Sequence, residues 1–197
     1  MAVIFPRWSN RLPLLLAGIA PIVLGFVVTG VWYYLSPNFT DVGYRPQQPI
    51  AFSHKVHAGE LGMDCRYCHN TVERGARAAI PPTATCMNCH AYVKTGSDEI
   101  KKIWASAENN TPIEWVRVHD LPQYAYFNHS AHVTRGVSCV ECHGRVDTME
   151  VVYQHETLSM GWCLTCHRNP DPHVRNPSLV TQLDWGLDMS ASERIAD

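Results

Sequence analysis

Cys65-Arg-Tyr-Cys-His69 is the stretch that decides the fold of this chain, because its pattern returns three more times. The other copies are Cys86-Met-Asn-Cys-His90, Cys139-Val-Glu-Cys-His143 and Cys163-Leu-Thr-Cys-His167. The four copies of C-x-x-C-H contain all 8 cysteines of the 197-residue sequence. A chain that uses every thiol in one five-residue motif is organised around those motifs.

This spacing is the attachment signature of a c-type haem. Two thiols separated by two residues match the two vinyl groups of the porphyrin, and the next histidine reaches the iron from one face. The sequence therefore predicts four covalently bound c-type haems. The predicted attachment residues are Cys65, Cys68, Cys86, Cys89, Cys139, Cys142, Cys163 and Cys166, and the predicted proximal ligands are His69, His90, His143 and His167.

Two other uses of paired cysteines compete with this interpretation. Zinc sites also contain C-x-x-C groups, but zinc does not require a histidine after each second cysteine. Disulfides are favoured outside the cytoplasm, but a disulfide framework does not place every cysteine in the same motif. The complete motif in four of four copies favours haem.

The region that carries the motifs repeats itself. One copy begins Phe52-Ser-His54-Lys-Val-His57 and continues to the motifs at Cys65 and Cys86. The other begins Phe127-Asn-His129-Ser-Ala-His132 and continues to the motifs at Cys139 and Cys163. Recurrence of the whole order indicates a duplication, with copies at residues 51–90 and 127–167.

Each copy of the repeat supplies two candidate distal ligands. A six-coordinate haem iron needs a ligand on its second face, and residues at i and i+3 of a helical turn lie on one side of it. We expect His54 to serve the haem of the Cys65 motif and His129 that of the Cys139 motif. His57 and His132 are then expected to cross to other haems.

Three further side chains stay open as distal ligands. They are Met160, His119 and His155. A thioether ligand from Met160 would raise the potential of its haem, and it would displace one repeat histidine.

An uncharged run of 24 residues, 12–35, precedes the repeat. As a helix it would be roughly 36 Å long, enough to cross the ~30 Å hydrocarbon layer. Arg7 and Arg11 precede this run and Asp41 follows it, so residues 1–11 are expected in the cytoplasm and the haem domain on the periplasmic side of a bacterial inner membrane. A cleaved signal peptide is the alternative, but its apolar part is normally shorter.

The remaining segments have weaker patterns. Residues 36–50 contain three prolines and are interpreted as a linker. Residues 98–108 predict a helix with Ile100, Ile103, Trp104 and Ala107 on its packed side. Residues 171–197 are predicted to form an irregular tail, a docking segment that lies against a partner or across the chain's own haem domain.

Composition excludes several functions. A net charge of −2 gives no basic surface for nucleic acid, and the sequence contains no Ser-His-Asp set, phosphate loop or dinucleotide fingerprint. Residues 51–170 are too few to build an apolar core for each haem, so the haems must form much of the core. The predicted fold class is therefore mostly irregular with short α-helices, a multihaem cytochrome c domain of cytochrome c3/c7-like haem packing on one transmembrane helix.

The sequence between the motifs resembles that of one protein family. The resemblance rests on five stretches, 52–69 (from Phe52-Ser-His), 80–90 (from Ile80-Pro-Pro), 115–122 (Trp115-Val-Arg-Val-His-Asp-Leu-Pro), 126–132 (Tyr126-Phe-Asn-His) and 160–167 (from Met160-Gly-Trp). The sequence is similar there to the multihaem cytochrome c component of bacterial alternative complex III, a quinol:electron-acceptor oxidoreductase. Members of that family often have five haem motifs, and this chain has four.

The resemblance implies a role and partners. Polytopic membrane subunits would oxidise quinol, an iron–sulfur subunit would pass electrons to these haems, and a monohaem cytochrome c subunit or a soluble acceptor would take them. The chain would then be an electron-transfer subunit and no enzyme by itself. Two alternatives remain, a small quinol dehydrogenase that feeds periplasmic reductases and a tethered multihaem shuttle.

Overall fold

The computed structural model describes residues 5–186 and 189. They form two compact units, one up to Asp41 and one from Val42 onward. Residues 1–4 of the predicted cytoplasmic segment and residues 187, 188 and 190–197 of the predicted tail lie outside the described residues.

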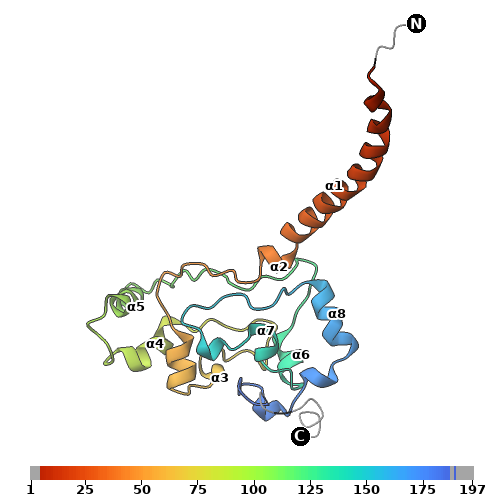
Figure 1. Ribbon diagram of the computed structural model, residues 1–197. Coiled ribbons are helices and arrows are strands. Elements are labelled where there is room, and N and C mark those ends of the chain that lie inside the picture. The colour runs from red at the N-terminus through yellow and green to blue at the C-terminus, as the bar shows by residue number, and fades with distance from the viewer. Residues whose placement is uncertain (1–4, 187–188, 190–197) are drawn as a thin grey trace. The chain divides into compact units, whose positions relative to one another are not determined.

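The first unit is dominated by one long helix. It contains η1 (Arg7–Arg11), α1 (Leu12–Tyr34) and α2 (Pro37–Thr40), so α1 agrees closely with the predicted run 12–35. Pro21 lies inside α1, where it removes a backbone hydrogen bond, and α1 is visibly curved in Figure 1. The ring of Phe39 packs against Tyr34 at 4.7 Å and against Tyr33 at 5.8 Å, which closes the helix end.

α1 has the length and composition of a membrane span. The helical run Arg7–Tyr34 covers 28 residues with a mean hydropathy of 2.4 in its most apolar window. Its side chains are exposed, with Leu14 at 76% and Phe26 at 77%. Both a membrane anchor and a signal sequence meet this description.

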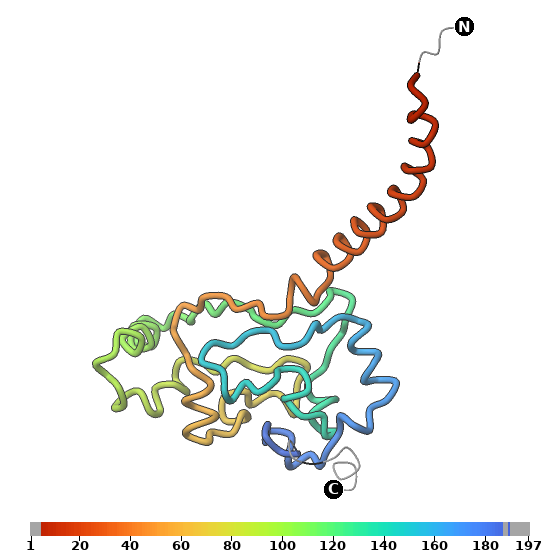
Figure 2. The backbone as a smooth tube through the Cα atoms, viewed as in Figure 1, coloured from red at the N-terminus to blue at the C-terminus, as the bar shows by residue number. Residues whose placement is uncertain are grey.

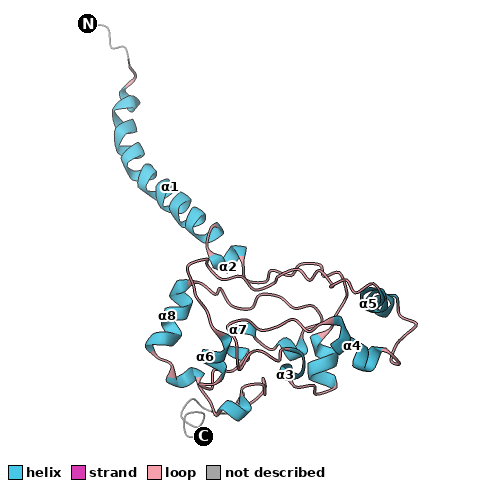
Figure 3. Cartoon of the chain, turned by 180° about the vertical axis from the view of Figure 1, so that it is seen from behind, coloured by secondary structure: helices cyan, strands magenta, loops and turns pink. Residues whose placement is uncertain are grey.

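The second unit consists of short helices joined by long irregular segments (Figure 3). Its helices are α3 (Cys65–Cys68), α4 (Thr83–His90), α5 (Asp98–Glu108), α6 (His129–Val133), α7 (Val140–His143) and α8 (Met160–Arg168). Single turns add η2 (Lys55–Glu60), η3 (Val146–Thr148), η4 (Asp171–His173) and η5 (Pro177–Leu179). The described part of the chain contains no strand, only an isolated bridge between Val137 and Val174. The expected irregular, helical architecture is confirmed.

A small apolar core lies between α4 and α5. Ile50, Ile100 and Ile103 are buried there, with Cys86 and Trp104 packed against them. Helix α5 matches the predicted range, and two of its predicted packing residues are buried.

One expectation for α5 was wrong. Ala107 is exposed, and Ser106 occupies the buried position beside it. The Ser106 hydroxyl donates to the carbonyl of Thr111 at 2.6 Å and shares a 2.8 Å hydrogen bond with the hydroxyl of Thr83. Tertiary hydrogen bonds at the helix end therefore favour the polar residue in the buried position.

Three irregular segments, around residues 43–44, 120 and 154, lie side by side in the second unit (Figure 2). The side chain of Gln154 is only 2% exposed and joins them. Its Oε1 accepts from the backbone N–H of Asp120 at 3.2 Å, and its Nε2 donates to the carbonyl of Glu156 at 3.0 Å. Its backbone pairs with Gly43 and Tyr44 at 2.8 and 3.1 Å.

The predicted linker differs from expectation at its C-terminal half. The side chain of Gln48 exchanges two hydrogen bonds of 2.9 Å with the backbone of Val116. Ile50 is 5% exposed and belongs to the core. Residues 42–50 are therefore integrated into the second unit, because their backbone groups find partners there.

Residues 171–183, here called the C-terminal strap, lie across the chain's own domain. Val180 is fully buried and Leu183 is 4% exposed. The N–H of Arg175 donates to the carbonyl of Gly136 at 2.9 Å. A Cβ on Gly136, whose φ is +86°, would collide with the carbonyl of Arg175. Of the two expected locations for the tail, the described part occupies the intramolecular one.

Candidate haem centre

The four C-x-x-C-H motifs lie on or at the ends of short helices in the second unit. The first is on α3 and the second forms the end of α4. The third begins directly before α7, and the fourth lies within α8. A helical turn brings both thiols and the following imidazole of each motif to one side.

Each motif histidine faces a second histidine from the repeat. The ring centres of His54 and His69 are 6.5 Å apart and the rings are parallel within 2°. Those of His57 and His90 are 6.1 Å apart at an angle of 62°. The rings meet across the space next to the motif rather than stacking in contact.

The other copy of the repeat has the same arrangement. The ring centres of His129 and His143 are 6.5 Å apart at 9°. Those of His132 and His167 are 6.0 Å apart at 71°. The four pairs thus use the four histidines of the repeat, one against each motif.

These separations fit one iron between each pair. Because a metal–imidazole nitrogen bond is about 2 Å long, two rings on opposite sides of one ion place their centres roughly 6 Å apart. A direct ring contact would bring the centres closer, and a pair that shares no ion has no reason to keep this spacing four times.

The pairs line one large cavity. Its volume is about 2710 Å³, whereas a pocket for one drug-sized ligand measures roughly 300–1,000 Å³. All eight motif cysteines and all eight paired histidines are among its lining residues. The space and the donors therefore suit several bulky planar groups in one compartment.

The aromatic residue at the start of each repeat copy holds both of its histidines. Phe52 stacks on His57 at 4.4 Å and meets His54 edge-on at 4.8 Å. Phe127 packs on His132 at 4.6 Å and meets His129 edge-on at 4.8 Å. The F-x-H-x-x-H pattern contained this signal, although sequence reasoning gave the phenylalanine no role.

Backbone carbonyls orient several of these rings. Nδ1 of His69 lies 2.7 Å from the carbonyl of Ala79, and Nδ1 of His90 lies 3.0 Å from that of Val93. Such a bond leaves Nε2 free for a metal and fixes the ring. The first and second motifs thus present oriented imidazoles.

The repeat histidines are oriented in a similar way. Nδ1 of His57 lies 2.8 Å from the carbonyl of Ser53, four residues earlier. Nδ1 of His132 makes the same bond at 2.8 Å, four residues back in its own copy. His54 differs, because its buried Nδ1 has no hydrogen-bond partner among the described residues.

His143 is oriented by a side chain. Its Nδ1 lies 3.2 Å from Nε2 of His119, with the two rings perpendicular at 83°. His119 was expected as a possible distal ligand, but it lies behind His143 as a hydrogen-bond partner. Sequence reasoning missed this role, since 24 residues separate the two.

Burial keeps the imidazoles of His54, His143 and His119 neutral. It lowers the pKa of His54 to about 4 and that of His143 to about 3, with neighbouring imidazoles adding to the effect. Burial also lowers the pKa of His119 to about 4. A neutral imidazole is the form that binds a metal.

None of the eight motif cysteines is paired with another in a disulfide, and burial raises the pKa of the Cys142 thiol to about 12. No group of three or more His, Cys, Asp and Glu side chains within the described residues is arranged to hold a metal ion. A zinc site of four protein ligands therefore finds no support in this part of the chain.

The remaining ligand candidates have other surroundings. Met160 begins α8 and is 39% exposed, while His132 already faces the fourth motif. Nε2 of His155 lies 3.6 Å from the carboxylate of Glu156. Neither is opposed to a motif histidine in the described pairs.

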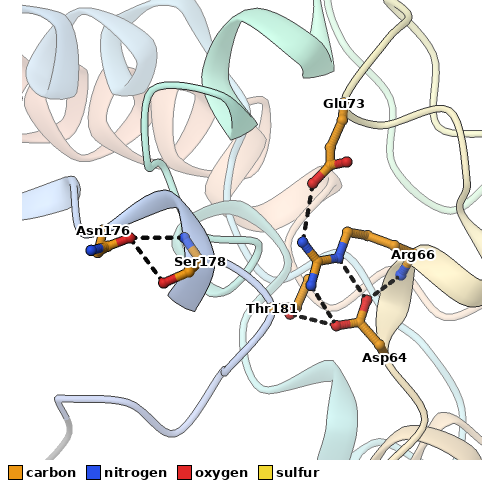
Figure 4. Close-up of polar contacts among 6 residues, drawn as sticks. All are labelled: Asp64, Arg66, Glu73, Asn176, Ser178 and Thr181. Carbon is orange, nitrogen blue, oxygen red and sulfur yellow. Dashed lines mark hydrogen bonds and ion pairs between the residues drawn. The ribbon is translucent and has the colours of Figure 1, made fainter.

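Charged residues fix the first motif to its surroundings (Figure 4). Asp64 caps α3 by accepting from the N–H of Arg66 at 2.8 Å. It also accepts from the Arg66 guanidinium and, at 2.9 Å, from the hydroxyl of Thr181 on the strap. The guanidinium in turn binds Glu73 at 3.1 Å. The Arg66 hydrogen bonds lower the pKa of Asp64 to about 2.

The sequence matches one family model and one known protein. The model of the "Class III cytochrome C family" matches residues 37–119, which contain the first repeat copy. The "Menaquinone reductase, multiheme cytochrome c subunit" of Nitratidesulfovibrio vulgaris (strain Hildenborough) is 31% identical over 175 residues, covering 77% of this chain and 82% of the relative. The chain belongs to the family of multihaem cytochrome c subunits that this relative represents. Membership implies covalently bound c-type haems, and the donors described above fit that group.

Proposed function

We propose that this cytochrome binds four haems, each held between one motif histidine and one repeat histidine. The four pairs of opposed rings carry this proposal. The pairs that would hold the four irons are His54 with His69 in the first centre, His57 with His90 in the second, His129 with His143 in the third and His132 with His167 in the fourth. The centres are numbered by motif along the chain.

Two imidazoles on each iron would leave no open coordination position for a substrate. A bound haem supplies a ferric/ferrous couple. The protein's part is to hold the imidazoles, to exclude water from the pairs that contain His54 and His143, and to bring the four centres into one cavity. The chain then transfers electrons and transforms no substrate itself.

We propose further that the chain is the electron-transfer subunit of a complex linked to the quinone pool. The relative's name describes a subunit of a menaquinone reductase, and the sequence resembles the multihaem cytochrome c component of alternative complex III. Helix α1 would anchor the chain in a bacterial inner membrane with residues 1–11 in the cytoplasm. The haem unit would lie on the periplasmic side. Its partners would be polytopic quinol-oxidising subunits, an iron–sulfur subunit and a monohaem cytochrome or soluble acceptor.

The direction of electron flow has two candidates. The resemblance to alternative complex III favours quinol oxidation, with these haems passing electrons outward. The relative's name favours quinone reduction, with the haems passing electrons toward the membrane. In both directions this chain performs the same relay between a membrane-embedded partner and a partner outside the membrane.

Isolation of the tagged chain from native membranes tests the assignment. We expect polytopic and iron–sulfur subunits to co-purify, and quinol to reduce the haems in the assembly but not in the isolated chain. Oxidation of quinol by the isolated chain would instead support a small quinol dehydrogenase. Isolation without partners under mild detergent would support a tethered shuttle. Reduction of quinone from a prereduced soluble donor, faster than quinol oxidation, would select the reductase direction.

A further inference from the structure

The first and second motifs are neighbours. Nδ2 of Asn88, inside the second motif, donates to the hydroxyl of Tyr67, inside the first, at 2.9 Å. Phe52 contacts both facing histidines, His54 and His57. One ring therefore spans the two pairs of this repeat copy.

The third and fourth pairs are neighbours in the same way. Phe127 contacts both facing histidines, His129 at 4.8 Å and His132 at 4.6 Å. These two histidines lie one helical turn apart on α6. The two copies of the repeat thus contain equivalent pairs of centres.

The two copies meet through the first and third centres. The backbone N–H of His129 and its Nδ1 both approach the carbonyl of Ala76, at 3.2 and 2.9 Å. The same short segment holds His69 through Ala79. A ring of the third centre and a ring of the first therefore depend on one piece of backbone.

The C-terminal strap joins the same two motifs. Thr181 donates to Asp64, the residue before the first motif, as Figure 4 shows. The carbonyl of Val180 accepts from the N–H of Cys139 at 3.2 Å and from the hydroxyl of Ser138 at 2.7 Å. Adjacent strap residues thus connect the beginnings of the first and third motifs.

Exposure separates inner from outer motifs. Among the anchoring cysteines and motif histidines, Cys89 of the second motif and His167 of the fourth are exposed. The corresponding residues of the first and third motifs are all half-buried. The outer motifs are therefore the ones that a redox partner can approach.

We propose that the four centres form a linear relay in the order second, first, third, fourth, and that electrons enter and leave at the second and fourth centres. This inference rests on the proposed function. Each step would move one electron from a ferrous to a neighbouring ferric iron, with no bond made or broken. The quinone-linked partner is the redox agent at one end, and a cytochrome or copper protein is the agent at the other.

Ring angles make the order measurable. In low-spin ferric haems with two imidazoles, near-parallel rings give a rhombic EPR spectrum, and near-perpendicular rings give one low-field feature of large g. The inner pairs are parallel within 2° and 9°, and the outer pairs are crossed at 62° and 71°. The haem-loaded chain should therefore show two rhombic and two large-g centres.

The test uses His54→Met and His57→Met in the haem-loaded full chain. A methionine ligand raises the potential, so the altered centre is reduced first and becomes diamagnetic while the others stay ferric. Its direct neighbours then lose a magnetic partner, and their electron-spin relaxation slows. Pulsed EPR of samples poised at this stage identifies the neighbours by their signal class.

The relay order predicts different results for the two variants. Reduction in His57→Met should slow one of the two rhombic signals and leave the large-g signal unchanged. Reduction in His54→Met should slow one rhombic and one large-g signal. A relay in chain order would instead slow both rhombic signals in His57→Met and no rhombic signal in His54→Met, and that result would overturn the proposal. His132→Met and His129→Met repeat the test in the second copy if a first-copy variant loses its haem.

The unaltered protein tests whether the second and fourth centres are the ends of the relay. A soluble dysprosium chelate should accelerate relaxation of the large-g signals several-fold more than that of the rhombic signals, and equal acceleration would refute the assignment of the ends. Fewer than four haems, or loss of the two signal classes, would contradict the proposed axial pairs themselves. Four bis-histidine haems with another coupling pattern would contradict only the order.

Discussion

Replacement of His119 should change the potential of one centre alone. Nδ1 of His143 lies 3.2 Å from Nε2 of His119, whose neutral ring is able to accept that hydrogen bond. A bonded Nδ1–H makes the imidazole a better electron donor and stabilises ferric iron. His119→Phe removes the acceptor and should therefore raise the potential of the third centre.

The size follows from the hydrogen bond. A buried hydrogen bond contributes about 1 kcal/mol, and if most of that favours the ferric form, the shift is about 40 mV for one electron. EPR-monitored redox titration resolves it as displacement of one of the two rhombic signals. His119→Gln restores an acceptor and should recover much of the original potential.

His155→Phe is the matched control, because the His155 ring packs against Gly144, directly after His143, and its polar contact is with the Glu156 carboxylate at 3.6 Å. An equal shift in this control, or an unchanged potential in His119→Phe with four haems bound, would refute the assigned hydrogen bond. Displacement of a large-g signal instead would place His119 at another centre.

Three further predictions concern stability and ligand geometry. Gln154→Leu should lower the free energy of unfolding by about 2–4 kcal/mol in denaturant titrations of the haem-loaded chain, because it leaves the N–H of Asp120 and the carbonyl of Glu156 without their partner; an unchanged midpoint would contradict this. The stabilisation from ionised Asp64 is complete above its ordinary pKa of 3.8 and is lost as the pH falls toward 2. Asp64→Asn should therefore remove this contribution to the fall of the melting temperature with pH. An unchanged dependence of the melting temperature on pH in the variant would refute the prediction. Phe127→Ala should broaden the EPR signals of the third and fourth centres and spare the other two; equal broadening of all four would show that the ring does not hold His129 and His132.

The motifs were predictable because covalent chemistry fixes their spacing. Two thiols and an imidazole must lie within five residues to reach one porphyrin, so the Cys65 motif and its three copies are visible without any tertiary information. The helix at residues 98–108 was predictable for a local reason too, since Ile100 and Ile103 follow helical periodicity and both are buried. The sequence also suggested His54 for the first centre, and its ring lies opposite His69.

Features that depend on distant segments were not visible. The packing of His119 behind His143 joins residues far apart in the chain, and no sequence pattern near His119 predicts this contact. Gln154 resembles any surface glutamine in the sequence, yet it is nearly fully buried between three segments. The buried position of Val180 likewise depends on the fold. A tail rich in proline has no periodic pattern that predicts the surface against which it packs.

An intact mass spectrum of the mature chain tests the central claim most directly. Because every C-x-x-C pair is assigned to one porphyrin, the denatured protein should keep the mass of four haems, since thioether bonds survive unfolding. A chain that carries fewer than four haems, or that loses a metal such as zinc on unfolding and returns to its bare mass, would contradict the account.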